Sequence, residues 1–577
     1  MTRLKGQKYR TYIDVKFRSI FVASTFSMLI EYLMSLSDKI IAGNLIGAEA
    51  LSAITLVEPF TLLIAFIACV LADITGAPVT EATGKGDIKR AEQYFSQSLL
   101  IAIVIGLFLT IIYVAFTEQL IEMVAGTSGQ AAYVSDYFSI LRFLPLPMLL
   151  NAVIYPIVLY RGGEQYCNIS ACFSIISNIG LSVILCHFIG MRGMGLGTVI
   201  GSCLGLLPLI LFLVSPKGKM KLSFYFSIRD IRDNLIYSLG GSLTYFYMAI
   251  FQIIMNMFIM ERFSEDGIII FTGVINVAGL MAALTDGIIE FLMPMLNSYR
   301  GEKNELGCKC VVEKSLKASI AESIILTLIL CLFARVFARV FGVEDVRLAA
   351  KFANALRIYA ASSVCYYVIN LYAKYYLYTG KAAFCLGIDC LKDLVFPGVC
   401  GISFGMMFGL NGIWFGLSIA QVILLVGGYF LIRRKNNAGK DLLFLNTDKM
   451  AEQYMWNIRM NQEQIMQLVE EIRETLKKEG ISTKQINKAA LVVEESQMRD
   501  LVLNKENNKV IIECSMLKGE DITLILRNTG ICNNILDEDN PDSLSAKIVS
   551  KMAGISNSYI LVNGNNRLIF HIAREEN

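Results

Sequence analysis

Two carboxylates stand within the first long apolar stretch of this sequence. Glu31 and Asp38 are seven residues apart, which places them two turns apart on one face of a helix. A carboxylate inside a membrane is costly and normally faces a cavity or a partner group rather than lipid. Such a group can bind a proton or Na⁺, and the alternative is a structural pair with helix ends or with the neighbouring Lys39. We take both carboxylates as candidates for a cation-binding site.

Four further polar residues in apolar stretches could line the same cavity. Asp286 and Glu290 are four residues apart and share a helix face, although either could instead pair with a Lys or Arg near the membrane edge. Asn256 lies in a stretch of interleaved aromatic residues and methionines, 243–260, which suits either binding of flat cationic compounds or plain helix packing. The cavity candidates are Glu58, Asn256, Asp286 and Glu290.

Histidine and cysteine offer little material for catalysis. The chain has only His187 and His571, so neither a histidine metal site nor a Ser-His-Asp triad is expected. The 14 cysteines lie mostly in apolar stretches without CxxC spacing, and we expect them to be reduced packing residues. We therefore expect these residues to form neither a metal site nor a catalytic site.

The composition of the chain requires a lipid environment. Of 577 residues, 55% are hydrophobic and 18% charged, and the mean hydropathy of +0.55 is too high for an ordinary soluble protein. The apolar residues fall into runs of about 20 or more, the length that a helix needs to cross a bilayer. The twelve predicted membrane helices are 17–43, 52–76, 96–116, 132–159, 166–190, 193–214, 233–259, 268–295, 315–340, 352–378, 384–408 and 411–433.

Lys and Arg gather in alternate loops between these helices. The loops after the second, fourth, sixth and eighth helices are basic, whereas those after the first, third and eleventh contain no Lys or Arg. The positive-inside rule then places both termini in the cytoplasm, in a multi-pass protein of the inner (cytoplasmic) cell membrane. The basic N-terminus is followed by a long apolar run without a small-residue cleavage site, so we predict a retained first helix.

An internal repeat divides the membrane region. A shift of about 217 residues places 161–164 on 378–381, and 193–197 on 410–414. Because six helices separate the two copies, both copies have the same orientation in the membrane. The predicted parts are a cytoplasmic N-terminus, 1–16; a first six-helix lobe, 17–214; a cytoplasmic linker, 215–232; and a second six-helix lobe, 233–435.

Several motifs in these helices carry a family resemblance. Their order resembles that found in multidrug and toxic compound extrusion (MATE) transporters. The motifs are the stretch from Asp38 to Gly43, the loop from Gly84 to Ala91, Asn178, the run from Gly193 to Gly197 and the run from Gly409 to Trp414. The resemblance covers about 17–435 and predicts an all-α membrane protein with twelve helices in two parallel-repeat lobes.

The resemblance also implies a function. It predicts a transporter and not an enzyme, with no metal or cofactor and with H⁺ or Na⁺ as its coupling ion. This cation-gradient-coupled antiporter would export small amphipathic or cationic compounds by alternating access between the lobes. The resemblance assigns cation coupling to Asp38, and we group Asp38, Glu31 and Asn178 as the coupling site. Many family members have an Asp four residues after the asparagine, whereas this chain has Ser182, so the second acid of that site is missing.

Two other functions remain open at this point. A transporter-like membrane sensor could regulate a cytoplasmic partner, and flippases of lipid-linked intermediates share the same superfamily fold. The expected partners are a small-molecule substrate and the lipid bilayer, with no nucleic acid. The C-terminal part could also bind a cytoplasmic regulatory protein or a second copy of itself.

The C-terminal part, 445–577, has the composition of a soluble domain. Its patterns alternate between helix and strand and predict a small α/β domain of the α+β sandwich type. A hairpin is predicted across Asn563, Gly564 and Asn565. The predicted elements are helices at 447–479, 483–503 and 542–553 and strands at 508–515, 521–527, 557–563 and 566–573.

The order of these elements resembles the histidine-kinase-like ATPase domain, particularly its anti-sigma-factor kinase branch. The stretches 491–499, 526–530 and 543–549 match its three nucleotide boxes. Glu495 is retained, but Arg499 replaces the Mg²⁺-binding asparagine and Asn528 replaces the adenine-binding aspartate. The lid, 542–546, lacks glycine. Because phosphoryl transfer without the Mg²⁺ ligand loses its main charge neutralisation, we predict a vestigial nucleotide site and a regulatory domain.

Overall fold

The computed structural model describes most of the 577 residues, and all structural statements concern the described part. The chain divides into two compact units that are treated separately. The membrane unit comprises Ser27–Asp286 and Ser319–Gly428, and the tail unit comprises Met1–Phe26, Gly287–Ala318 and Tyr429–Asn577. The described residues are 11–84, 87–126, 130–160, 163–215, 220–223, 225–341, 343, 345–435, 450–505, 507, 509–518, 522–531, 558–562 and 565–572.

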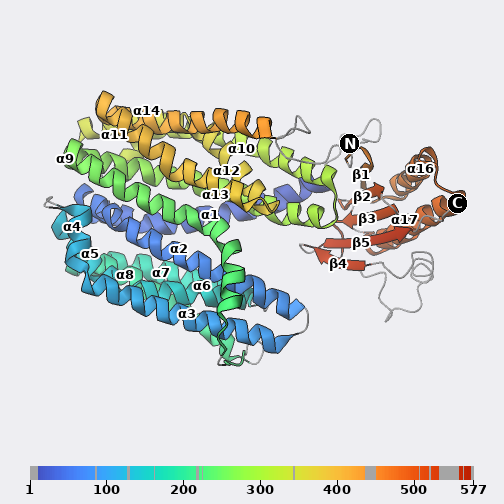
Figure 1. Cartoon of the computed structure of the whole chain (residues 1–577), viewed down its shortest axis with the longest axis horizontal. Coiled ribbons are helices and arrows are strands. Elements are labelled where there is room, and N and C mark those ends of the chain that lie inside the picture. Colours follow the sequence, from blue (N-terminus) through green and yellow to red (C-terminus); the bar gives the residue numbers. More distant parts are fainter. Residues whose placement is uncertain are drawn as a thin grey trace. The chain divides into compact units, whose positions relative to one another are not determined.

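The structure is mostly helical, with a small sheet near its C-terminus (Figure 1). The helices up to residue 435 are α1 Tyr12–Leu45, α2 Ala48–Gly84, α3 Ile88–Ala115, α4 Thr117–Ala125, α5 Ala131–Leu141, α6 Pro145–Tyr160, α7 Glu164–Ile189, α8 Met191–Val214, α9 Ile228–Gly301, α10 Glu305–Val340, α11 Val346–Ala360, α12 Ser363–Tyr378, α13 Ala382–Cys390, the π-helical turn η1 Leu391–Val395 and α14 Phe396–Lys435. The later elements are β1 Gln453–Arg459, α16 Gln462–Lys478, α17 Thr483–Leu503, β2 Ile511–Lys518, β3 Ile522–Asn528, β4 Ser558–Val562 and β5 Asn565–Ile572.

Eight helices of the described part are long and apolar enough to cross a membrane. The number is nine if α5 and α6, which meet at a bend of 50°, are counted as one broken span. One of the eight is the 53-residue segment Ala382–Arg434, which contains two predicted helices and is broken at Gly409, where φ is 70°. A multi-helix membrane region is therefore confirmed, whereas the count of twelve and the division into two lobes stay predictions.

Helices α2 to α8 pack on one another as a connected bundle in the membrane unit. Helix α7 runs along α8, and α6 contacts α2, α3 and α8 (Figure 1). The α7–α8 contact is close because Gly193, Gly197, Gly201 and Gly205 recur every four residues on one face of α8. This glycine stripe faces α7 and extends the predicted 193–197 motif by two turns.

The glycine stripe leaves no room for larger side chains. A Cβ atom added to Gly197 would lie 2.7 Å from the backbone nitrogen of Ser182, and one added to Gly201 would lie 2.9 Å from the Cβ of Asn178. The stripe therefore fixes the positions of Ser182 and Asn178, the two α7 residues singled out by the sequence.

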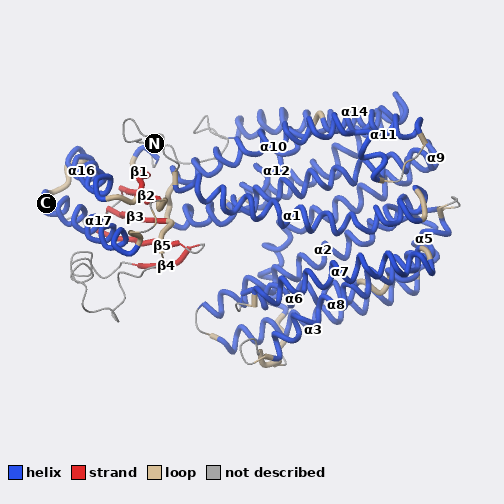
Figure 2. The backbone as a smooth tube through the Cα atoms, turned by 180° about the vertical axis from the view of Figure 1, so that it is seen from behind, coloured by secondary structure: helices blue, strands red, loops and turns tan. Residues whose placement is uncertain are grey.

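The sheet of the tail unit has the strand order β1-β2-β3-β5-β4, and every neighbouring pair is antiparallel. Figure 2 shows these strands in red beside α16 and α17. Alternate residues of the strands, among them Trp456, Cys514, Leu524 and Phe570, are buried in one hydrophobic core with both helices. One face of the sheet is thus covered by α16 and α17.

The tail predictions are largely confirmed at the level of elements. Helix α17 coincides with the predicted 483–503, and β4 and β5 form the predicted hairpin. The helix predicted at 447–479 is wrong in its first part, because Gln453–Arg459 is a strand paired with β2 and α16 begins only at Gln462. The predicted helix 542–553 lies outside the described residues.

The glycine stripe gives a stability prediction. Replacing Gly197→Ala will lower the free energy of unfolding by about 1–3 kcal/mol, because α7 must move away from α8 to admit the methyl group. The matched control is Gly180→Ala on α7, where a Cβ would meet nothing within 4 Å. Unfolding of the purified protein in detergent measures both, and equal stability of the two variants would contradict the close contact.

Candidate functional site

Asp38 lies in the interior of the membrane unit, where α1 faces α7 and α8. Its side chain is buried, and the hydroxyl of Thr198 donates a hydrogen bond to its Oδ2 at 2.7 Å. Asn178 and Ser182 of α7 lie within interaction range of the same carboxylate. A cavity of about 450 Å³ opens here and is lined by Asp38, Asn178, Thr198 and Tyr137, among others. The structure thus brings Asp38 and Asn178 of the predicted coupling site together.

Buried oxygen atoms without a hydrogen-bond partner in the described part of the structure gather around Asp38. Asp38 Oδ1, Asn178 Oδ1 and Ser182 Oγ have no hydrogen-bond partner among the described atoms. Buried polar atoms without partners are costly and uncommon in native structures. The carboxylate's own Oδ1 and the two neighbouring oxygens form a donor set suited to a proton or a hard cation such as Na⁺. Ser182 supplies an oxygen where the family pattern has its second acid.

Lys39, the next residue on α1, makes a different set of contacts. Its ammonium donates to Glu58 Oε1 at 2.8 Å and to Asn276 Oδ1 at 2.5 Å. Lys39 is buried and Glu58 is mostly buried, so this ion pair is shielded from solvent. The alternative in which Lys39 neutralises Asp38 by a direct pair is not what the structure has.

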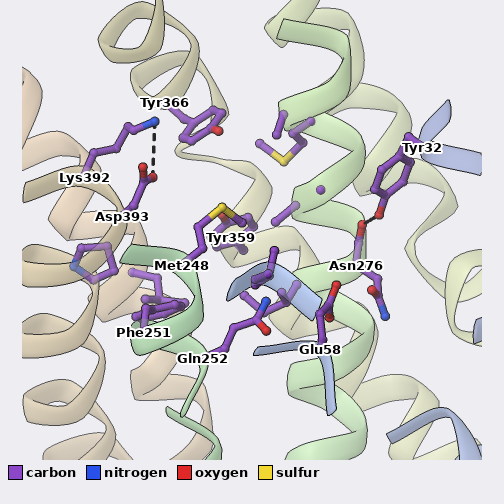
Figure 3. A pocket seen from close by; sticks show the side chains of 18 of the residues that line it. Tyr32, Glu58, Met248, Phe251, Gln252, Asn276, Tyr359, Tyr366, Lys392 and Asp393 are labelled. Atoms are coloured by element: carbon purple, nitrogen blue, oxygen red, sulfur yellow. Dashed lines mark hydrogen bonds and ion pairs between the residues drawn. The ribbon is translucent and has the colours of Figure 1, made fainter. Parts of the chain in front are cut away.

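A second cavity, of about 140 Å³, is also lined by Lys39 and Glu58. Figure 3 shows this cavity from close by. Its wall combines aromatic side chains and methionines with a few polar groups. The hydroxyl of Tyr32 donates to the backbone carbonyl of Asn276. The residues labelled in Figure 3 are Tyr32, Glu58, Met248, Phe251, Gln252, Asn276, Tyr359, Tyr366, Lys392 and Asp393.

One wall of this second cavity carries a charged cluster that the sequence analysis missed. Lys392 Nζ lies 3.3 Å from Asp393 Oδ1 and 3.6 Å from Asp389 Oδ1, and it donates to Asn370 Oδ1 at 3.2 Å. Lys374 joins the cluster at 3.8 Å from Asp389. The signal was available, because residues 389, 392 and 393 are charged, lie within a predicted membrane helix and fall at helical spacing.

Lys392 and Asp393 of this cluster lie on the π-helical turn η1, whereas Asp389 lies on α13 and Lys374 on α12. Pro397 stands two residues after this turn. In a regular helix its N–H would donate to the carbonyl of Asp393, but proline has no N–H. The proline ring would also clash with that carbonyl. The wider turn relieves this conflict. π-Helical turns occur often at functional sites, and here the turn presents Lys392 and Asp393 to the cavity.

The other predicted cavity residues lie in different places. Glu58 lines both cavities. Asn256 is buried on α9 without hydrogen-bond partners for its amide among the described atoms, but it lines neither cavity. Asp286 is half-buried within electrostatic range of Tyr366, whereas Glu290 is exposed. The side chain of Glu31 lies outside the described residues.

The predicted nucleotide-site residues lie in the tail unit. Glu495 and Arg499 are half-buried on α17, and Asn528 is buried at the end of β3. The side-chain amide of Asn528 donates to Asp500 Oδ2 at 2.7 Å, and its Oδ1 accepts from the backbone of Gly530 at 3.1 Å. Asn528 is thus tied into the domain on both sides. The predicted lid lies outside the described residues.

Comparisons with known proteins agree with this architecture. The sequence profile of the MatE family matches residues 23–188. The fold is similar to the inward-facing conformation of a multidrug resistance MATE family transporter of the MOP superfamily, at 20% identity and a TM-score of 0.62 over 72% of this chain and 97% of that one. It is similar to the outward-facing conformation of such a transporter at 19% identity and a TM-score of 0.60, over 75% and 98% of the two chains.

A third similar structure is a MOP superfamily transporter from Pyrococcus furiosus, at 19% identity and a TM-score of 0.60 over 74% of this chain and 98% of that one. For that transporter, the reverse polarity of its binding pocket is described as suggesting a different function. No curated protein sequence matches the chain. At these identities the comparisons establish the fold: the chain has the fold of MATE transporters, which are integral membrane proteins with many apolar helices.

The charged cluster around η1 gives a second stability prediction. The Lys392→Ala substitution will lower the free energy of unfolding by about 3–5 kcal/mol, because the buried carboxylates of Asp389 and Asp393 lose their nearest cation. Replacing Arg192→Ala removes an exposed ion pair with Asp136 and should cost at most about 1 kcal/mol. Unfolding in detergent compares the two, and a similar small loss for both would show that the cluster is not buried.

Proposed function

We propose that this protein is a cation-coupled antiporter that exports small amphipathic or cationic compounds across the inner membrane. The observation that carries the proposal is that the two cavities share Lys39 and Glu58. One cavity has the oxygen donors suited to a coupling ion, and the other has the aromatic wall suited to a cargo. A single ion pair therefore lies between the ion site and the cargo site.

This arrangement provides a route for coupling. A proton or Na⁺ bound at Asp38 removes negative charge beside Lys39 and so changes the balance that holds Lys39 between Glu58 and Asn276. Those three residues come from α1, α2 and α9, and α9 belongs to the second predicted lobe. Rearrangement of this contact would shift the two lobes between outward-open and inward-open states, as alternating access requires.

The cargo class follows from the wall of the second cavity. Phe251, Tyr359 and Tyr366 can stack on flat rings, and Met248 adapts to varied shapes. Glu58 and Asp393 can attract a positive charge on the cargo, while Lys39 and Lys392 keep the wall close to neutral. Amphipathic compounds with one positive charge suit this combination best.

For the tail we propose a regulatory role without ATP hydrolysis. The side chain at the expected adenine position, Asn528, is held by Asp500 and Gly530, and Arg499 stands where a Mg²⁺ ligand would be needed. Transport would then depend on an ion gradient across the membrane rather than on the tail. We also propose that both termini, and with them the tail, lie in the cytoplasm.

The transport proposal is tested with purified protein in lipid vesicles. Efflux of a fluorescent amphipathic cation is measured under a H⁺ gradient or a Na⁺ gradient, for the wild type and for Asp38→Asn. We expect gradient-driven flux that falls at least about tenfold in the variant, a loss equivalent to about 1.4 kcal/mol in the barrier, because the amide cannot take up the coupling ion. Dye binding without a gradient should persist.

The matched control is Asp136→Asn, an exposed carboxylate on α5 paired with Arg192. Its flux should equal that of the wild type. Wild-type protein without gradient-driven flux of any amphipathic cation would refute transport, and full activity of Asp38→Asn would refute the coupling role of Asp38. The gradient that drives the flux identifies the ion.

A further inference from the structure

A polar row crosses the face of the tail sheet that α16 and α17 leave uncovered. Asn457 on β1 pairs with Glu513 on β2, Glu513 pairs with Arg527 on β3, and Arg527 pairs with Arg567 on β5. Side chains of directly paired residues point to the same face, so these four residues form one continuous line across four strands. An exposed sheet face would leave such a row in water.

This row is instead buried against the turn between α9 and α10. Glu302 in that turn accepts hydrogen bonds from Arg527 and, at 3.0 Å, from Arg567. The hydroxyl of Tyr299 donates to Glu513 Oε1 at 2.7 Å, and the Arg527 guanidinium lies 4.2 Å from the centre of the Tyr299 ring. The side chains of Glu302, Glu513 and Arg527 are at most 3% exposed.

A glutamine at the edge of the sheet extends the same contact through the backbone. Gln453 Nε2 donates to the carbonyl of Lys303, and its Oε1 accepts from the backbone N–H of Leu306, both at 2.9 Å. The turn between α9 and α10 is therefore bound both by charged groups and by a backbone-directed amide.

The beginning of α1 binds at the other end of the row. The backbone N–H of Tyr12 donates to Asn457 Oδ1 at 2.8 Å. Asp14 forms an ion pair with Lys314 of α10 at 2.7 Å. Burial raises the pKa of Asp14, but the hydrogen bonds from Lys314 and Thr11 outweigh this effect. The pKa of Asp14 therefore lies below its ordinary value, and the carboxylate is charged at neutral pH.

The energetics of this contact argue against a freely tethered tail. Glu513 and Arg527 would be fully hydrated on a detached domain, whereas here each has lost its water and depends on the partner groups for its hydrogen bonds. Because these buried charged groups need specific hydrogen-bond partners, the contact between the sheet and the α9–α10 turn has a defined geometry. The contact joins the start of α1, from the first predicted lobe, to the α9–α10 turn, from the second.

We propose that the polar row is a latch through which the tail restrains the transport cycle. With the row engaged, the start of α1 and the α9–α10 turn are held together at the cytoplasmic side. A regulator that binds the tail and withdraws the row releases them. This inference rests on the proposed alternating access, and it makes the tail an autoinhibitory domain.

The test uses the full-length protein in vesicles and two partly exposed tail residues that bind the α9–α10 turn, Gln453 and Arg567. The variants are Gln453→Ala, which loses the hydrogen bonds to Lys303 and Leu306, and Arg567→Ala, which loses the ion pair with Glu302. The matched control is Arg473→Ala on α16, on the covered side of the sheet. Release of the latch is followed by thiol labelling of Cys310, which is half-buried within electrostatic range of Glu513.

Each variant should raise both the labelling rate of Cys310 and the gradient-driven flux by about fivefold, the effect of losing about one hydrogen bond or ion pair. The control should behave as the wild type. Faster labelling with unchanged or reduced flux would overturn the restraint, and unchanged labelling would overturn the latch itself. If no variant transports anything, the proposed function fails together with the restraint, while the labelling still decides whether the tail docks.

Discussion

A charge buried in a membrane needs a partner, and this requirement organises the polar interior of the membrane unit. The Lys39 ammonium binds Glu58 and Asn276, so one side chain links three helices. Asp38 is the next residue along α1, and consecutive helical residues point about 100° apart. It therefore faces Thr198 on α8 instead. Asp38 and Lys39 are thus held by different partner groups, while Lys39 lines both cavities.

The sequence allowed prediction of the membrane class. It also made Asp38 a candidate, because an acid within an apolar run stands out without knowledge of the fold. The partners of Asp38 and Lys39 could not be predicted, since Thr198 is 160 residues away and Asn276 is 237. Such pairs depend on how helices pack. The same limit explains why β1 was taken for a helix: its strand conformation is fixed by pairing with β2, more than 50 residues later.

The Lys392 cluster shows a different kind of gap. Its charged residues were visible in the sequence. That Lys392 and Lys374 neutralise Asp389 and Asp393 can be seen only in the structure. Together with Lys39 and Glu58 the cluster gives the second cavity both signs of charge. Such a wall can hold a cargo by shape and ring stacking without the cost of burying a single unpaired charge.

The π-helical turn at Leu391–Val395 has a consequence for the register of the helix that contains it. One such turn accommodates about one residue more than an α-helical turn, which rotates everything beyond it by roughly 100° relative to an unbroken α-helix. The faces of α13 and α14 are therefore set independently. Asp389 can point into the charged cluster while Pro397, eight positions later and beyond the π-helical turn, lines the cavity.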